Sequence, residues 1–452
     1  MKKLLVVLLS LGLIVAFSTA ASAADVKFSG QYYVGGVYES NPMLTPDDVA
    51  DGRSHYSHAF FYTRTRFQPV FQIAEGLTFT TRFDALEKQW GNTNLQGGGA
   101  TDYANSRRYQ QVALTQGQKI QEEIEFERAY VTFLTGIGQF QVGYQNVDAW
   151  GTDFSDYNNT APSIQYAAKV GPLTLALIYE KFYENDTAGQ PATYTNNVDA
   201  DNDTYAIAGI YNGQGIEAGM LYKYYALNKT KPAGYKTQRN LLSPYVKATF
   251  GPVYIEGELQ YWFGKAAEYE APLAGTADVD LQAYGAYLKA KMNLGPAYFG
   301  ALFAYLSGDD MSDATKTNLN PGGHGSSFVH SLIMMYEPLS TWSNSGSTAA
   351  NLYGSSNMFV HNAFGGFNPT PKWNVEANLT YADVEKIPTG VTQDKHLGME
   401  FDVTATYKIY DNLSYMVGAG YLWTGDYFKG ATNAPKEIDN DYVLKNQLTL
   451  SF

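Results

Sequence analysis

Apolar and polar residues alternate along the chain in segments of about ten residues, and this pattern continues to the last residue. At 373–381, for example, Trp373, Val375 and Leu379 fall on one face of an extended segment, and the intervening positions are polar. Alternation with a period of two is the signal of a β-strand with one buried or apolar face. Its persistence predicts one large sheet rather than several domains.

Short turns and longer polar segments separate these predicted strands in strict alternation. Eight short turns are expected, three of them at Gly-Pro pairs, because Gly and Pro favour the backbone angles that turns need. The pairs start at Gly171, Gly251 and Gly295, and the other turns lie at 74–77, 135–138, 212–215, 369–372 and 411–412. Long segments are expected near 40–55, 88–120, 147–162, 185–202, 227–240, 264–280, 307–356, 385–396 and 425–440. Eight turns and nine long segments give seventeen connections, and hence about eighteen strands.

The predicted fold class is all-β: a transmembrane antiparallel β-barrel with short periplasmic turns and long extracellular loops. A soluble β-sandwich would show a similar alternation, since its strands also have one wet face. Two features favour lipid on the outside. Aromatic residues such as Trp373 and Tyr381 stand at the ends of apolar faces, as an interfacial girdle requires. The chain also ends on an alternating strand whose last residue, Phe452, resembles the assembly signal of outer-membrane barrels.

The first 23 residues have the organisation of a secretory signal peptide. Lys2 and Lys3 precede an apolar run at 4–17, and Ala21, Ser22 and Ala23 form a small-residue cleavage site. We therefore expect residues 1–23 to be removed and residues 24–452 to form a single barrel domain. With no cysteine at the junction, a lipid-anchored protein is excluded, and the expected location is the outer membrane of a Gram-negative cell.

Composition narrows the possible functions. Only 17% of residues are charged, below the roughly 25% usual for soluble domains. The mean hydropathy of −0.28 argues against a helical membrane protein. The absence of cysteine excludes disulfides, thiolate nucleophiles and c-type haem attachment. A net charge of −13 leaves no basic surface for nucleic acid.

If apolar faces meet lipid, the opposite faces line the lumen. Arg64, Arg66 and Arg82 would then form a basic wall, facing Glu256 and Glu258 across the pore. The predicted pore-lining residues are Arg64, Arg66, Arg82, Asp84, Glu125, Glu127, Glu256, Glu258, Lys289 and Lys291. Acidic and basic residues occur in similar numbers on the inward faces, so strong cation selectivity is not expected. For each residue the alternative is a solvated side chain without a special role.

Two long segments could narrow the lumen. The segment 147–162 carries Trp150, Asp153 and Asp156 and could fold inward as a constriction or project outward as an ordinary loop. The segment 307–356 contains an apolar patch at 332–335, and such a patch should be buried. Either the lumen or a neighbouring subunit could bury it.

No catalytic, metal or cofactor site is expected from the sequence. Asp199, Asp201 and Asp203 have the spacing that opens a calcium loop, but Thr204 replaces the required glycine and Ile210 the final glutamate. The six histidines belong to no nucleophile-and-base pattern, although His55 and His58 could share an ion. Neither a P-loop nor a Rossmann fingerprint is present.

One stretch is similar to a known family. The sequences FERAYVTF at 126–133 and GQFQVGYQNVDAWGTDFSDY at 138–157, with SGDD at 307–310 and TGDYF at 424–428, resemble the porin-like proteins of metal-reducing bacteria. More loosely, the layout is similar to the alginate-export type of eighteen-stranded barrel. The resemblance implies an outer-membrane channel and carries over no substrate.

The sequence therefore predicts a non-enzymatic porin for passive diffusion of small hydrophilic solutes and ions, since barrels of sixteen to eighteen strands leave an aqueous channel. One alternative is a barrel sheath around a periplasmic multihaem cytochrome, and another is a channel selective for a polysaccharide or other solute. Expected partners are outer-membrane lipid, lipopolysaccharide and the barrel-assembly machinery. A homotrimer is expected only by analogy with general porins.

Overall fold

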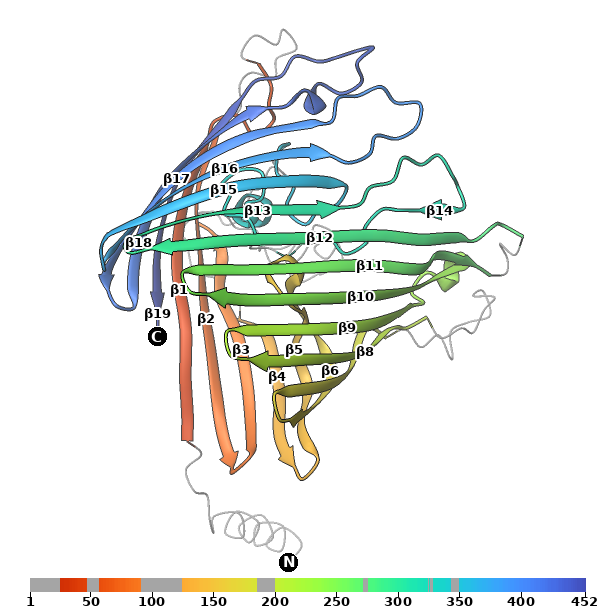
Figure 1. The fold of residues 1–452 in the computed structure, drawn as a ribbon, viewed down its shortest axis with the longest axis vertical. Helices are drawn as coiled ribbons and strands as arrows, with labels where there is room; N and C mark the ends of the chain where they lie inside the picture. The colour runs from red at the N-terminus through yellow and green to blue at the C-terminus, as the bar shows by residue number, and fades with distance from the viewer. Residues whose placement is uncertain are drawn as a thin grey trace, which may run out of the picture.

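The computed structural model describes residues 25–46, 57–90, 124–184, 200–270, 275–323, 325, 328–342 and 349–452. The predicted signal peptide lies outside these ranges, as do Asp199, His55 and most of the segment 88–120. Within them the chain forms a single antiparallel sheet that closes on itself (Figure 1).

Nineteen strands occur in the described residues, and eighteen of them form the wall of the barrel. The remaining strand, β14 (Lys316–Thr317), is a two-residue segment that pairs in parallel with β12. The wall strands are β1 (Asp25–Glu39), β2 (His58–Ala74), β3 (Leu77–Gln89), β4 (Ile124–Thr135), β5 (Gly138–Ala149), β6 (Asp156–Val170), β7 (Leu173–Tyr183), β8 (Asn202–Gly213), β9 (Ile216–Leu227), β10 (Tyr235–Phe250), β11 (Val253–Tyr269), β12 (Val279–Leu294), β13 (Ala297–Leu306), β15 (Met358–Thr370), β16 (Trp373–Val384), β17 (His396–Tyr410), β18 (Leu413–Thr424) and β19 (Asp441–Ser451). The predicted count of eighteen is confirmed.

Each wall strand pairs with its neighbours in the sequence, and β19 pairs with β1 to close the ring. All eight predicted short turns are present, joining β2 to β3, β4 to β5 and so on around the barrel. At the Gly-Pro turns the glycine has a positive φ, 58° at Gly171, which suits the first central position of a type II′ hairpin turn. Because the strands alternate in direction, the short turns share one rim and the long connections the other.

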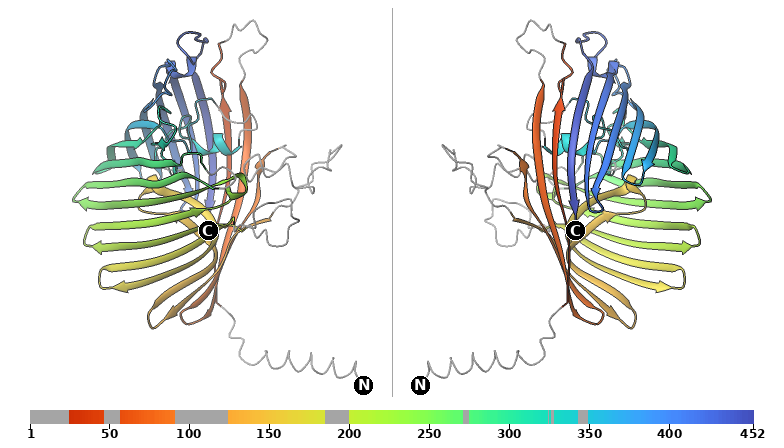
Figure 2. Two further views of the ribbon diagram at one scale, coloured as in Figure 1. Left: turned by 90° about the vertical axis from the view of Figure 1, so that its right-hand side faces the viewer. Right: turned by 90° about the vertical axis from the view of Figure 1, so that its left-hand side faces the viewer.

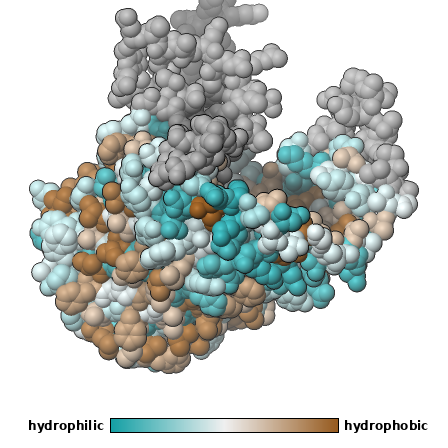
Figure 3. All heavy atoms as spheres, turned by 90° about the horizontal axis from the view of Figure 1, so that it is seen from above, coloured by the Kyte–Doolittle hydropathy of each residue, from teal (hydrophilic) through white to brown (hydrophobic). Residues whose placement is uncertain are grey.

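The outer face of the wall is apolar. Phe126 and Ile164 are exposed there, and Trp373, Tyr381 and Trp423 are exposed near strand ends, as the girdle prediction requires. Figure 3 shows hydrophobic residues spread over the broad outer side, with hydrophilic residues gathered toward the middle of this view. In the part of the chain that the structure describes, no helix is long and apolar enough to cross a membrane.

One outward prediction is wrong. Alternation along β17 places Leu397 on the outer face with Met399 and Phe401, but Leu397 is buried in the interior cluster. The β16–β17 ladder shifts register here, because Ala382 pairs with Gly398 and the next pair is Asp383 with His396. Leu397 is the extra residue of this bulge, and a bulge reverses the face that a side chain points to.

The interior of the barrel holds most of the apolar core. In the described parts of the connections between strands there are three short helical turns, η1 (Asp153–Ser155), η2 (Lys231–Ala233) and η3 (Asp426–Lys429), and one helix, α2 (Glu337–Trp342). Figure 2 shows α2 lying beside the inner side of the wall rather than outside it. The connections that carry η1 and α2 determine the shape of the lumen.

Candidate pore constriction

The predicted basic wall is present on β2 and β3, but acidic partners neutralise it. Arg66 donates two hydrogen bonds to Asp84, at 2.8 Å from Nε and 2.6 Å from Nη2. Arg82 Nη2 lies 2.6 Å from Glu127 Oε2. Bidentate and charge-assisted pairs of this kind hold their side chains in fixed positions. The arginines of the predicted basic wall therefore belong to a row of ion pairs with acidic side chains of β3 and β4.

The remaining members of this group lie on the same wall. Arg64 lies 3.5 Å from Glu87 and over the ring of Tyr33, 4.9 Å from its centroid. Glu125 stands opposite Asp84 in the β3–β4 ladder. Glu125 is the second residue of β4, and it is exposed.

Glu256 and Lys289 form a second local pair, on β11 and β12. Their side chains are 3.2 Å apart, and Glu256 also accepts hydrogen bonds from the hydroxyls of Tyr254 and Tyr287. Lys291 lies over the ring of Tyr298, 4.0 Å from its centroid. Among the described residues no ion pair joins the β2 arginines to the β11 glutamates, because each charge has a partner on its own side.

The connection between β5 and β6 folds inward, so the inward alternative for this segment holds. The strands extend further than predicted, and the connection is residues 150–155 rather than 147–162. Glu258 anchors it by accepting hydrogen bonds from the backbone nitrogen and the hydroxyl of Thr152, both 2.8 Å, and from Ser243. Phe154 is fully buried, and its ring stacks on Tyr287 at 5.4 Å.

The three residues predicted to form a constriction in this connection lie in three different environments. Trp150 donates from its indole nitrogen to the backbone oxygen of Ser243, which holds the ring against β10. Asp153 keeps its carboxylate about half exposed, 4.0 Å from Lys289. Asp156 is the first residue of β6 rather than part of the connection.

The long connection between β13 and β15 also folds inward and is held by one buried carboxylate. Glu400, on β17, accepts hydrogen bonds from the backbone nitrogens of Leu332, Ile333 and Met334 and from the hydroxyl of Ser331, at 2.7–2.8 Å. Its side chain is fully buried. Successive backbone N–H groups around one anion form an anion-binding nest.

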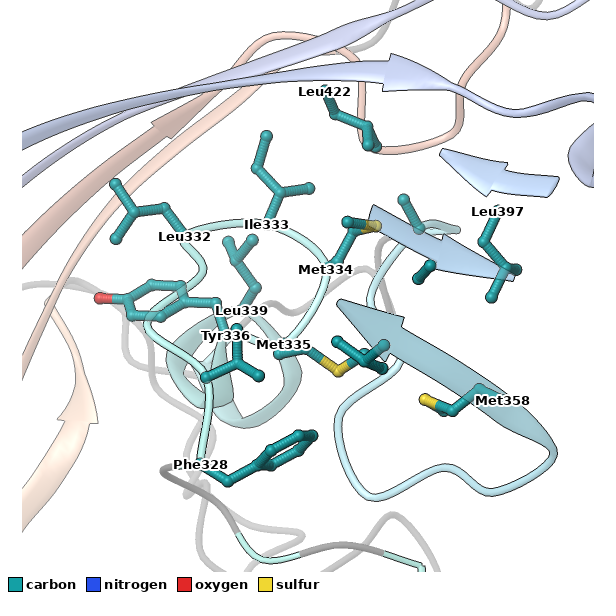
Figure 4. Packing of buried hydrophobic residues seen from close by; sticks show 14 of the residues in the cluster. Phe328, Leu332, Ile333, Met334, Met335, Tyr336, Leu339, Met358, Leu397 and Leu422 are labelled. Atoms are coloured by element: carbon teal, nitrogen blue, oxygen red, sulfur yellow. The ribbon is translucent and has the colours of Figure 1, made fainter. Parts of the chain in front are cut away.

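The apolar patch of this connection packs inside the barrel, so the lumen alternative holds over a neighbouring subunit. Figure 4 shows Ile333 and Met334 beside Leu422 and Leu397, and Met335 near Met358. Full burial of such side chains contributes about 1.5–3 kcal/mol each. The patch is the one feature of this connection that the sequence could reveal.

Aromatic residues continue this packing toward β2. Trp342 stacks on Tyr62 with ring centroids 5.5 Å apart, and the Tyr62 and Tyr336 hydroxyls are 3.2 Å apart. Burial raises the pKa of Tyr336 far above its ordinary value, so this hydroxyl stays protonated. The connection therefore packs against a continuous arc of the inner wall, which runs from β13 through β19 and β1 to β2.

The two inward connections touch each other. Gly325 donates its backbone N–H to the backbone oxygen of Phe154 at 2.8 Å, and the Tyr157 hydroxyl donates to the backbone oxygen of Gly323 at 3.0 Å. Phe154 also meets the edge of Phe328. Together the two connections form one packed unit inside the barrel, which we call the partition.

A cavity of about 240 Å³ lies beside this partition, on the side of β5 to β11. Lys223 is buried in it, with its ammonium 2.5 Å from both Asp148 and Glu180. Arg239 lies over the rings of Tyr225 and Trp262, at 5.0 and 5.1 Å. The lining residues are Asp148, Ala149, Trp150, Ser155, Tyr157, Asn159, Ile178, Glu180, Ala206, Leu221, Lys223, Tyr225, Arg239, Leu241, Gln260, Trp262, Pro321 and Gly322.

The pattern of the sequence alone does not reveal this cavity. Arg239 falls in the predicted long segment 227–240, whereas β10 already begins at Tyr235. Alternation can place Lys223 and Glu180 on inward faces, but it cannot bring together residues from different strands. Better placement of the β10 start, from the Thr237, Arg239 and Leu241 alternation, could have put Arg239 on the inner wall.

Histidine and carboxylate clusters do not form a metal site in the described ranges. His58 contacts Glu39, with 2.7 Å between Nε2 and Oε2. The Glu39 side chain is fully buried, so the His58–Glu39 pair is part of the packed structure of the barrel wall.

Comparison with known proteins places the fold. No protein-family model matches the chain, and no curated protein matches it. Solved structures that it resembles are OccK8 (OprE) of Pseudomonas aeruginosa, 11% identical with a TM-score of 0.52, and OccAB2 of Acinetobacter baumannii, 10% identical with a TM-score of 0.51. In each case the match covers 98% of that chain, and 95% and 94% of this one.

A third structure is P. aeruginosa OccK2 (OpdF) in complex with glucuronate, 13% identical with a TM-score of 0.50, with 95% of this chain and 97% of that chain covered. At these identities the likeness establishes the fold alone. The chain therefore has the closed, eighteen-stranded fold of outer-membrane porins.

Proposed function

We propose that this protein is an outer-membrane porin through which small hydrophilic solutes and ions diffuse passively. The observation that carries the proposal is the contrast between the two faces of one closed wall. The outer face exposes apolar residues, and the inner face carries paired charges such as Arg66 with Asp84. Charged groups on an inner face are compatible with water in the lumen.

The partition gives this porin a selective character. Two inward connections leave less open cross-section than an empty barrel of eighteen strands would have. Solute size and shape should therefore matter more than net charge, because the wall charges that we propose line the pore are paired locally. The pore-lining and constriction roles of the predicted residues are part of this proposal.

The packing inside the barrel favours passive diffusion of solutes over the alternative in which the barrel surrounds a cytochrome. The α2 connection occupies the space beside β2 and β15 to β19 that a protein partner would need. The proteins whose solved structures have a similar fold are channels rather than enzymes, and we infer no catalytic activity for this chain.

We further propose the route to the membrane. Export would use the signal peptide at 1–23, and Phe452 would serve in recognition by the barrel-assembly machinery. Lipid and lipopolysaccharide would contact the apolar outer face. A relation to the porin-like proteins of metal-reducing bacteria rests on the 126–157 stretch.

Single-channel recording of the purified mature protein in a planar bilayer tests the proposal. We expect stable openings with weak ion selectivity in a salt gradient. A matched variant replaces Leu332, Ile333, Met334 and Met335 with serine, which removes the apolar attachment of the long connection. Its conductance should be several-fold higher. Absence of conductance in both folded proteins would contradict the porin proposal.

A further inference from the structure

The cavity beside the partition presents aromatic rings whose polar atoms are already used. The Trp150 indole nitrogen donates to the backbone oxygen of Ser243, and that of Trp262 to Gln260 at 3.2 Å. The Tyr157 hydroxyl donates to a backbone oxygen of the long connection. The rings of Trp150 and Tyr157 therefore offer a bound molecule their faces rather than their hydrogen-bonding groups, whereas Arg239 already lies over the ring of Trp262.

The charges in the cavity balance. Lys223 and Arg239 are opposed by Asp148 and Glu180, and both carboxylates contact Lys223. An anion would approach two carboxylates, and a cation would approach a lysine and an arginine. The cavity as a whole therefore favours a ligand without net charge.

Hydrogen-bonding capacity nevertheless remains at its edge. Arg239 is held by stacking on Tyr225 and Trp262, and its buried Nε has no hydrogen-bond partner among the described residues. Asn159 donates to Asp148 at 3.2 Å, which leaves its amide oxygen for another donor. A ligand that carries several hydroxyl groups can pair with such donors and acceptors at once.

The volume sets the size of the ligand. A cavity of about 240 Å³ lies just below the ~300–1,000 Å³ typical of sites for drug-sized molecules. It suits one sugar ring better than an oligosaccharide. The C–H groups on the face of such a ring carry slight positive charge, which the negative face of an aromatic ring attracts.

We propose that this cavity is a binding site for a neutral monosaccharide in its ring form, occupied during passage through the pore. The ring lies against Trp150 and Tyr157, and the hydroxyls pair with Arg239, Asn159 and Asp148. The proposal rests on the proposed porin function, because the sugar reaches the cavity through the lumen. It adds a solute class that the barrel alone does not specify.

The test measures how solutes block the ion current of single channels. D-galactose is the probe, galactitol is its open-chain counterpart, and D-galacturonate is its charged counterpart. We expect galactose to interrupt the current at lower concentration than either of the others. Equal or stronger block by galactitol or by galacturonate would overturn the proposal.

Variants locate the effect. Trp150→Leu should raise the galactose concentration for half-block several-fold, because leucine lacks the negative face that an aromatic ring presents. Arg239→Gln should weaken block as well. Trp373→Leu, on the exposed outer face, is the matched control and should leave the block unchanged. Unchanged block in both cavity variants would also overturn the proposal.

The two proposals fail in different ways. Ion conductance without any solute tests the porin function, because it needs only an open path. If conductance is present and galactose has no effect, the sugar site is wrong and the porin proposal stands. Heat-modifiable migration on gels confirms that each variant is folded, and the wild-type comparison of the three solutes does not depend on any variant.

Discussion

At the scale of single residues, carboxylates in the interior have distinct partners and therefore distinct tasks. Asp84 receives a bidentate arginine on the wall. Glu258 and Glu400 instead receive backbone N–H groups from connections that fold inward. A buried or half-buried carboxylate is costly unless such donors are present, so each of these contacts constrains the segment that supplies the donor.

The ion pairs on β2 to β4 make a prediction about selectivity. Replacing Arg64, Arg66 and Arg82 together with glutamine removes three positive charges and leaves their acidic partners behind. Cation preference should increase, measured as a shift of the reversal potential in a salt gradient. The double variant Asp84→Asn with Glu127→Gln should shift it in the opposite direction.

The combination of all five substitutions is the control for this prediction. It removes three positive and two negative charges, so most of the field of the wall is cancelled and the reversal potential should lie close to that of the wild type. An unchanged potential in the arginine variant would mean that these side chains do not face the permeating ions.

At the scale of elements, the strands and short turns were predictable, and the paths of the long connections were not. Alternation is local, so eighteen strands and eight turns could be placed from the sequence, and the Gly-Pro pairs fixed three turns. The outward position predicted for Leu397 was wrong because the bulge at this residue depends on the neighbouring strand. The direction of the β5–β6 connection depends on Glu258, which lies about one hundred residues away. Of the candidate site, the sequence supplied individual inward residues but not the cavity they form.

The anchor of the long connection provides the prediction at this scale. Glu400→Gln keeps the size of the side chain but turns an acceptor of four hydrogen bonds into a neutral amide. Hydrogen bonds to charged groups are worth about 1.5–3 kcal/mol, against about 0.5–1.5 kcal/mol for neutral ones. The connection should therefore loosen, and single-channel recordings should show a noisier open state with higher mean conductance.

A carboxylate elsewhere provides the comparison. Glu437 is exposed in the connection between β18 and β19, so Glu437→Gln changes the same charge without touching the partition. Its recordings should match the wild type. Identical noise in the Glu400 variant would show that the apolar patch alone holds the connection in place.

At the scale of the whole molecule, the barrel depends on its two ends. β1 and β19 pair from Gln31 with Ser451 to Glu39 with Val443, and Gly30 exchanges backbone hydrogen bonds of 2.8 and 3.0 Å with Phe452. The Phe452 ring lies 6.2 Å from Phe28 and 6.0 Å from Phe67. We call the β1–β19 pairing the seam. Without it, backbone groups at two strand edges would face lipid unpaired, which costs several kcal/mol for each group.

Removal of Phe452 tests the seam. Deleting this residue takes away two backbone hydrogen bonds and an aromatic contact at the closing strand, so the yield of heat-modifiable protein in the membrane should fall several-fold. Phe452→Tyr keeps the ring and the backbone and is the matched control. Equal yields from the deletion and the control would contradict an assembly role for the last residue.

The seam also determines when folding of the barrel can be completed. Residues 30 and 452 must meet, so the first strand to emerge during synthesis waits for the last one before its free edge is paired. Contacts this distant in sequence slow folding and prolong the exposure of unpaired strands. The free edge of β1 therefore stays unpaired until β19 has been synthesised, and the chain has to be kept from aggregating during that interval.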